Sequence, residues 1–176
     1  MTTNPWEDEN SPWKNSVAFF TYLRGCLRAA WSKSPQKHNL IKKKRYQIAN
    51  PSKNAKKPTV WGFRCEMCQE EFVMSMCQVD HIHPAGSLQK REDIQGFVER
   101  LLFVTEDDLR LVCKPCNNAL SMSDKTGMTY EEAIVEKKVI AIMRDKQDKQ
   151  FLIDNGVEPL GNANLRRIQV KGVLTK

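Results

Sequence analysis

Two identical cysteine pairs enclose the part of the chain whose residue types could carry chemistry. Cys65 and Cys68 form one Cys-x-x-Cys pair, and Cys113 and Cys116 form the second. Each pair supplies two thiolates from one tight turn, and two such pairs complete a closed tetrahedral zinc site. Because a closed site leaves no ligand position for a substrate, we expect this zinc to be structural.

Residues suited to hydrolytic chemistry lie between the cysteine pairs and directly after them. The segment 79–84 contains Asp80, His81 and His83, and Asn117 follows the last cysteine. Histidine is the usual general base near neutral pH, while a hard divalent cation prefers carboxylate and amide oxygens. We therefore expect His81 to activate water, and Asp80 and Asn117 to hold a catalytic Mg²⁺ or Mn²⁺. Together these groups could hydrolyse a phosphodiester bond.

The sequence leaves the roles of several nearby residues open. His83 lies two residues after His81, so on an extended chain both rings point to the same side. His83 is then a third metal ligand, a phosphate contact, or a half-buried histidine in a turn. Arg110 is either a surface residue or a phosphate contact. Cys26 and Cys77 lie outside the pairs, and we expect both to be small buried hydrophobic residues.

Basic residues are concentrated in one stretch of the chain. The net charge is +7, and residues 11–65 contain thirteen Lys and Arg without one Asp or Glu. Such a stretch is typical of a surface that binds a polyanion, although a solvated surface or a localisation signal at 42–45 would look the same. We expect DNA to contact a set of basic side chains there: Arg24, Arg28, Lys42, Lys43, Lys44, Arg45, Lys56 and Lys57.

The periodicity predicts short helices and strands, which places the chain in the α+β class. A leader at 1–15 is expected to be flexible, and residues 152–176 show no periodic pattern. Helices are expected at 16–31, 40–48 and 94–102, from about 115, and from Thr129, a capping-box residue, to about 143. A strand is expected at 59–63 and a short strand or turn at 109–112, and residues 72–74 and 77–79 are expected to pair as a hairpin.

Around these residues the chain resembles the HNH endonuclease family, in the subgroup common in bacteriophage genomes. The resemblance is carried by Asp80-His81-Ile82-His83-Pro84, by residues 109–117 and by the middle segment 97–103. It is strong over residues 59–122. It implies a ββα-metal (HNH) core with a structural zinc, flanked by N-terminal and C-terminal helices. The expected regions are a basic helix and arm at 1–58, the core at 59–128, and a helix and tail at 129–176.

The resemblance also implies roles for individual residues. His81 matches the general base, Asp80 and Asn117 match the ligands of the catalytic Mg²⁺ or Mn²⁺, and the four paired cysteines match the zinc ligands. The chain departs from the family where Asp108 replaces an Asn that braces the loop, and where the lysine usual just after the last ligand is missing. The implied activity is that of a metal-dependent DNA endonuclease or nicking enzyme.

Two other classes of protein fit part of the pattern. A non-catalytic zinc module that binds nucleic acid explains the cysteines and the charge, but not the presence of Asp80, His81 and Asn117. A RING-type interaction domain needs more ligands than one cysteine pair at each end provides. No segment resembles a secretory signal or a membrane span. We expect a monomer in a reducing compartment, the host cytosol if a phage encodes the chain.

Overall fold

The computed structural model describes residues 4–52, 54 and 56–175, and it has the expected mixture of helices and small sheets. The chain divides into two compact units, Met1–Cys113 and Lys114–Lys176. The first unit contains both antiparallel sheets, and the second is helical in its described part. Among the described residues, no helix has both the length and the apolar character needed to cross a membrane.

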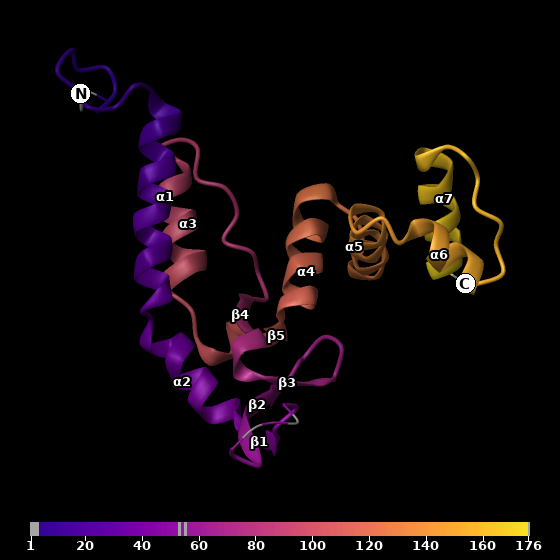
Figure 1. Cartoon of the computed structure of the whole chain (residues 1–176). Helices are drawn as coiled ribbons and strands as arrows, with labels where there is room; N and C mark the ends of the chain where they lie inside the picture. The colour runs from indigo at the N-terminus through magenta and orange to yellow at the C-terminus, as the bar shows by residue number, and fades with distance from the viewer. Residues whose placement is uncertain (1–3, 53, 55, 176) are drawn as a thin grey trace. The chain divides into compact units, whose positions relative to one another are not determined.

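The first unit opens with helix α1, Ser16–Ser32, close to the expected bounds. Asn15 caps it, because the Asn15 side chain accepts a hydrogen bond from the Ala18 N–H at 2.9 Å. Phe20 and Trp31 are its buried residues. α1 packs against helix α3, Asp93–Leu102, and Figure 1 shows the two helices side by side. This packing covers Phe97 and Leu101 of α3.

The segment before the sheets differs from the expected helix at 40–48. Helix α2 spans Pro35–Lys44, and strand β1 spans Tyr46–Ala49. Pro35 starts the helix early because its fixed φ suits the first helical position, where its missing N–H costs nothing. The chain then becomes extended at Arg45, whose ψ is 147°. β1 therefore joins a sheet instead of continuing the helix.

Strand β2 spans Thr59–Arg64 and pairs antiparallel with β1, so residues before and after residue 58 belong to one sheet. Gly62 faces the Ile48 side chain so closely that a Cβ there would lie 2.5 Å from its Cδ1 atom. The close approach therefore requires glycine. The expected division of the chain into three regions, at residues 58 and 128, stays a prediction.

The expected hairpin of residues 72–74 with 77–79 is wrong. Strand β3, Glu71–Val73, pairs with β2, whereas strand β4, Cys77–His81, pairs with strand β5, Leu109–Cys113. The 3₁₀ turn η1, Met74–Met76, carries the chain from one sheet to the other. A second 3₁₀ turn, η2 at Glu106–Asp108, precedes β5. The pair β4–β5 therefore places residues 77–81 beside residues 109–113.

The second unit begins with helices α4, Lys114–Thr126, and α5, Tyr130–Arg144. Thr129 and Glu132 form the expected capping box of α5. Helices α6, Asp148–Asp154, and α7, Ala163–Leu174, were not expected from the sequence. They pack with α5 around a buried apolar cluster, Val139, Leu152 and Val170.

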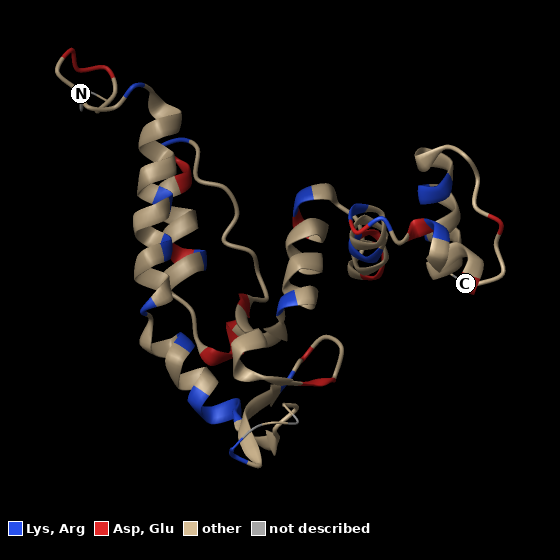
Figure 2. Ribbon diagram, viewed as in Figure 1, with Lys and Arg blue, Asp and Glu red and all other residues tan. Residues whose placement is uncertain are grey.

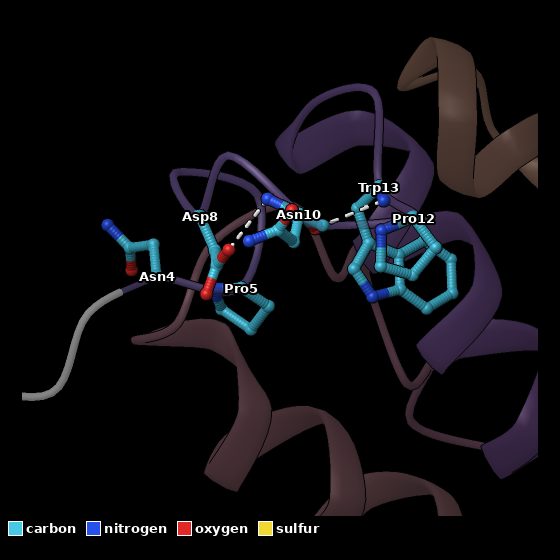
Figure 3. Close-up of a pocket in the computed structure, with 7 residues that line it drawn as sticks. Asn4, Pro5, Asp8, Asn10, Pro12 and Trp13 are labelled. Atoms are coloured by element: carbon cyan, nitrogen blue, oxygen red, sulfur yellow. Dashed lines mark hydrogen bonds between the residues drawn. The ribbon is translucent and has the colours of Figure 1, made fainter.

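Residues 4–13 pack through aromatic side chains, in contrast to the expected flexible leader. The Trp6 ring lies 5.4 Å from that of Phe19, and the Trp13 ring lies 4.9 Å from that of Tyr22. A shallow pocket of about 340 Å³ lies along this segment between Asn4 and Trp13 (Figure 3). This segment therefore packs against helix α1.

Candidate metal and catalytic site

The four paired cysteines come together as the spacing predicts. Their Sγ atoms all lie within 4.8 Å of one another, and Cys68 is the exposed member of the group. Cys65, Cys113 and Cys116 are buried. Four thiolates at this separation could hold a structural metal ion such as zinc.

Backbone N–H groups surround the Cys65 sulfur and favour its ionised form. Burial raises the pKa of the Cys65 thiol, but hydrogen bonds from the N–H groups of Cys68, Cys113 and Met67 outweigh burial. The net effect lowers this pKa to about 7. The Cys113 N–H points at the Cys65 Sγ atom from 3.3 Å. The turn closes at Gln69, whose φ of 63° lies in the left-handed region. The first cysteine pair is thus shaped to present a thiolate near neutral pH.

Glu66, inside the first cysteine pair, fastens that pair to strand β5. The Glu66 N–H donates to the Leu111 carbonyl at 2.9 Å, and the Leu111 N–H donates to Glu66 Oε1 at 2.7 Å. Lys44 of α2 reaches the same oxygen at 2.8 Å. The first cysteine pair and the strand leading to the second pair are therefore one connected structure.

Asp80 lies on β4 directly opposite Arg110 on β5, and the two side chains form an ion pair. Arg110 Nε and Nη2 each lie 2.8 Å from Asp80 Oδ2. Its third nitrogen, Nη1, lies 3.5 Å from Met67 Sδ. Both side chains are about one-fifth exposed, so solvent screens the pair only in part. Arg110 is therefore an ion-pair partner of the predicted metal ligand.

His81 ends strand β4 and is held between two elements. Its ring centroid lies 4.3 Å from that of Trp31, and its Nε2 atom lies 3.1 Å from the Leu101 carbonyl oxygen. A carbonyl oxygen only accepts hydrogen bonds, so Nε2 carries the proton and Nδ1 keeps the lone pair. Burial lowers the pKa of His81, and the charge of Arg28 adds to this effect. The neutral form of the ring is therefore favoured at pH 7, which the predicted role of general base requires.

Asp108, which replaces the family's loop-bracing Asn, braces the loop through its backbone. Its carbonyl accepts a hydrogen bond from the Ile82 N–H at 2.9 Å, directly after His81. Its carboxylate accepts from the Thr105 N–H at 2.7 Å, which lowers the pKa of Asp108. His83 is exposed, so it is not the half-buried turn histidine that was one alternative. Its role as metal ligand or phosphate contact stays a prediction.

Asn117 lies in the first turn of α4, directly after Cys116, in the second unit. Its approach to Asp80 stays a prediction. The Tyr130 hydroxyl donates to the Cys116 sulfur at 3.0 Å. Sequence reasoning missed this contact. The capping box that starts α5 at Thr129 was the available signal, since it fixes where Tyr130 enters the helix.

The cysteines outside the pairs differ from expectation. Cys26 is exposed, so the prediction that it is buried is wrong, and Cys77 is only partly buried. Cys77 lies opposite Cys113 in the β4–β5 pair. Burial, followed by the neighbouring Cys65, raises the pKa of the Cys77 thiol to about 11. Cys77 therefore stays protonated beside the cluster.

Many of the predicted DNA-binding side chains already have partners within the chain. Lys43 pairs with Glu106 at 2.6 Å, and the Arg45 guanidinium lies 4.3 Å from the centre of the Trp61 ring. The Arg28 guanidinium lies 5.9 Å from the centre of the Phe97 ring. Figure 2 shows basic residues spaced along α1 and α2. Exposed basic residues with no ion pair to any described residue remain in the predicted set: Arg28, Lys42, Arg45, Lys56 and Lys57.

Comparisons with known proteins add no relative to this picture. No family model matches the chain, and neither a curated protein nor a solved structure matches it.

Proposed function

We propose that the chain is a metal-dependent HNH DNA endonuclease or nicking enzyme with a zinc-stabilised ββα-metal core. The observation that carries the proposal is the His81 ring, held by the Leu101 carbonyl on Nε2 with Nδ1 left to accept a proton. The neighbouring Asp80 and the four clustered thiols are what such a core requires. The order β4, β5, α4 along the chain is also the order of the ββα motif.

In this proposal His81 removes a proton from water at Nδ1 while the Leu101 carbonyl keeps the ring in one tautomer. The lowered pKa of His81 keeps the ring neutral at pH 7, and its main cause is burial. Trp31 limits ring motion from one face. The deprotonated water then attacks the phosphorus of the DNA backbone, and the bond to the leaving oxygen breaks.

A hard divalent cation, Mg²⁺ or Mn²⁺, fits the oxygen donors expected at this site. Asp80 would supply a carboxylate and Asn117 an amide carbonyl. The ion pair with Arg110 uses Asp80 Oδ2, and no described residue makes a hydrogen bond or ion pair to Oδ1. When bound, the cation would neutralise charge on the phosphate and on the leaving oxygen. The four cysteines would hold zinc as a structural element.

The alternative is a zinc-stabilised module that binds nucleic acid without cutting it. The ion pair of Arg110 with Asp80 favours this alternative, because it already compensates the charge of the proposed metal ligand. In such a module Asp80 and His81 would stabilise the β4–β5 pair only.

Incubating supercoiled plasmid with the zinc-loaded chain and Mg²⁺ separates the two functions. The wild type should produce nicked or linear DNA, and leaving out Mg²⁺ while the zinc stays bound should stop the reaction. His81→Ala should lower the rate by about 10²–10⁴-fold, because it removes the general base. His38→Ala, which changes an exposed histidine of α2, is the matched control and should cut normally. Intact plasmid with the wild type, together with tight DNA binding, would establish the alternative.

A further inference from the structure

The Asp80–Arg110 ion pair places the Arg110 guanidinium beside the carboxylate that the proposed nuclease needs for its divalent cation. Two Arg110 nitrogens lie 2.8 Å from Asp80 Oδ2, so a cation bound to the same carboxylate would lie within several ångströms of the guanidinium. Like charges at that distance repel, and partial burial weakens solvent screening. Arg110 therefore opposes cation binding as long as no other anion is near.

A phosphate group would change this balance. It offers oxygen acceptors that match the fork of a guanidinium, and its negative charge offsets the added cation. The contact of Arg110 Nη1 with Met67 Sδ holds the guanidinium toward the first cysteine pair. Glu66 of the same turn binds the backbone of β5 at Leu111. Nε and Nη2 can thus exchange Asp80 for another acceptor while Nη1 keeps its contact with Met67.

We propose that Arg110 couples cation loading to DNA: it neutralises Asp80 in the free protein and moves onto the scissile phosphate when DNA and cation arrive. This inference rests on the proposed nuclease function and assigns Arg110 as a further residue that contacts substrate. Its benefit is that the free enzyme carries little of the hard cation and assembles its site on DNA. The coupling is reciprocal, so DNA should tighten cation binding as much as the cation tightens DNA binding.

If Arg110 exchanges acceptors in this way, removing its charge should raise the affinity for Mn²⁺ and lower kcat. Removing the charge with Arg110→Gln should tighten Mn²⁺ binding to the free, zinc-loaded protein by about tenfold, because a repulsive charge is removed. The same variant should lower kcat by roughly 10²-fold, because the developing charge on the phosphate is left without a donor. A side chain that only stabilises the fold would weaken both properties or change neither.

The test measures Mn²⁺ affinity by electron paramagnetic resonance and measures cleavage of a duplex oligonucleotide separately. Arg64→Gln is the matched control, since Arg64 is an exposed β2 residue whose ion pair with Glu71 is loose, at 4.0 Å, and it should change neither quantity. Arg110→Lys keeps the charge, so its Mn²⁺ affinity should stay near that of the wild type while kcat falls. Zinc content and circular dichroism establish that each variant is folded.

Three results are decisive. Tighter Mn²⁺ binding together with slower cleavage in Arg110→Gln supports the exchange. If the wild type cuts DNA but Arg110→Gln binds Mn²⁺ no more tightly, or has an unchanged kcat, the Arg110 inference is overturned. The nuclease proposal then still stands. A wild type that cuts no DNA with either cation overturns the nuclease proposal, and the exchange with it.

Discussion

The His81 side chain has its two ring nitrogens in different surroundings, and this asymmetry is what a general base needs. Nε2 faces the Leu101 carbonyl, whereas Nδ1 makes no hydrogen bond to any described residue. The packing of Trp31 contributes to the burial that lowers the pKa of His81. Arg28 lowers this pKa further, while Asp80 and Asp108 raise it. The position of the pKa therefore depends on the aromatic contact as well as on charge.

The first consequence is a pH profile whose acidic limb lies below about pH 6.5, the ordinary pKa of histidine. Cleavage should rise with pH through the lowered pKa of His81 and then level off, because the neutral ring is the proposed base. Trp31→Ala should admit water, raise this pKa and move the limb to higher pH, whereas Trp31→Phe should move it less. Rates measured across the acidic and neutral range check both variants. An unmoved limb in Trp31→Ala would show that burial by Trp31 does not set the pKa.

The same shift has a defined effect on stability. Because the folded pKa of His81 lies below its unfolded value, the unfolded chain binds the proton more readily. The contribution of neutral His81 is therefore complete above about pH 6.5 and disappears as the pH falls through the folded pKa. Loss of folding at acidic pH and loss of activity should thus overlap in the wild type.

The strands β4 and β5 depend on the cysteine cluster, since β5 ends at Cys113 and is fastened to the first pair by Glu66. Cys113→Ser should lose zinc and unfold this region, because structural zinc binding supplies on the order of 10 kcal/mol to small zinc domains. Cys26→Ser is the matched control, an exposed cysteine outside the cluster that should retain one zinc per chain. Elemental analysis and thermal melting measure both. Full zinc content and an unchanged melting temperature in Cys113→Ser would contradict this assignment.

Elements with strong local signals were predictable from sequence, and their partners were not. The capping box at Thr129 and the apolar spacing of α3 are set by neighbouring residues, so α5 and α3 were expected correctly. The pairing of β3 with β2 is non-local, and alternation along a strand does not name its partner. α6 is only seven residues long, and packing against α5 defines both α6 and α7 more than periodicity does.

The candidate site shows the same division. The spacing of the cysteines alone predicts their cluster, because each pair closes within one turn. The contact of Arg110 with Asp80 depends on the register of two strands separated by the whole of residues 82–108, which no local pattern fixes. The Trp31 contact with His81 depends in turn on how α1 packs. Residue types therefore suggested the chemistry, while tertiary contacts decide its electrostatics.

For the chain as a whole, the basic side chains should contribute unequally to DNA binding, because some of them are already paired with acidic groups. Lys42, Lys56 and Lys57 are exposed and make no ion pair with the described residues, while Lys43 and Lys44 pair with acidic groups. Changing the first three to Gln should weaken DNA binding at all sequences. The slope of log affinity against log salt should become shallower by about 0.9 for each phosphate that is no longer neutralised on duplex DNA.

A matched comparison uses Lys149→Gln, an exposed change in α6 that should leave the salt slope unaltered. Lys43→Gln should have a smaller effect than Lys42→Gln, because Lys43 is already shared with Glu106. Fluorescence anisotropy with a labelled duplex over a series of salt concentrations measures each variant beside the wild type. Equal slopes in the triple variant and the wild type would assign the exposed lysines to solvent or to another partner.

The ladder between β4 and β5 has a consequence for how fast the chain folds. Its two strands are joined by a long connection that includes all of α3, so pairing them requires closing a large loop before the ladder can form. Such non-local pairing slows folding because the closure entropy is spent before the ladder compensates it. A metal ion held by Cys65 and Cys113 would tether the end of β5 to the chain that precedes β4 before the ladder forms. Zinc would then act on the rate at which newly made chains mature, and chains made under zinc limitation would spend longer exposed to proteases.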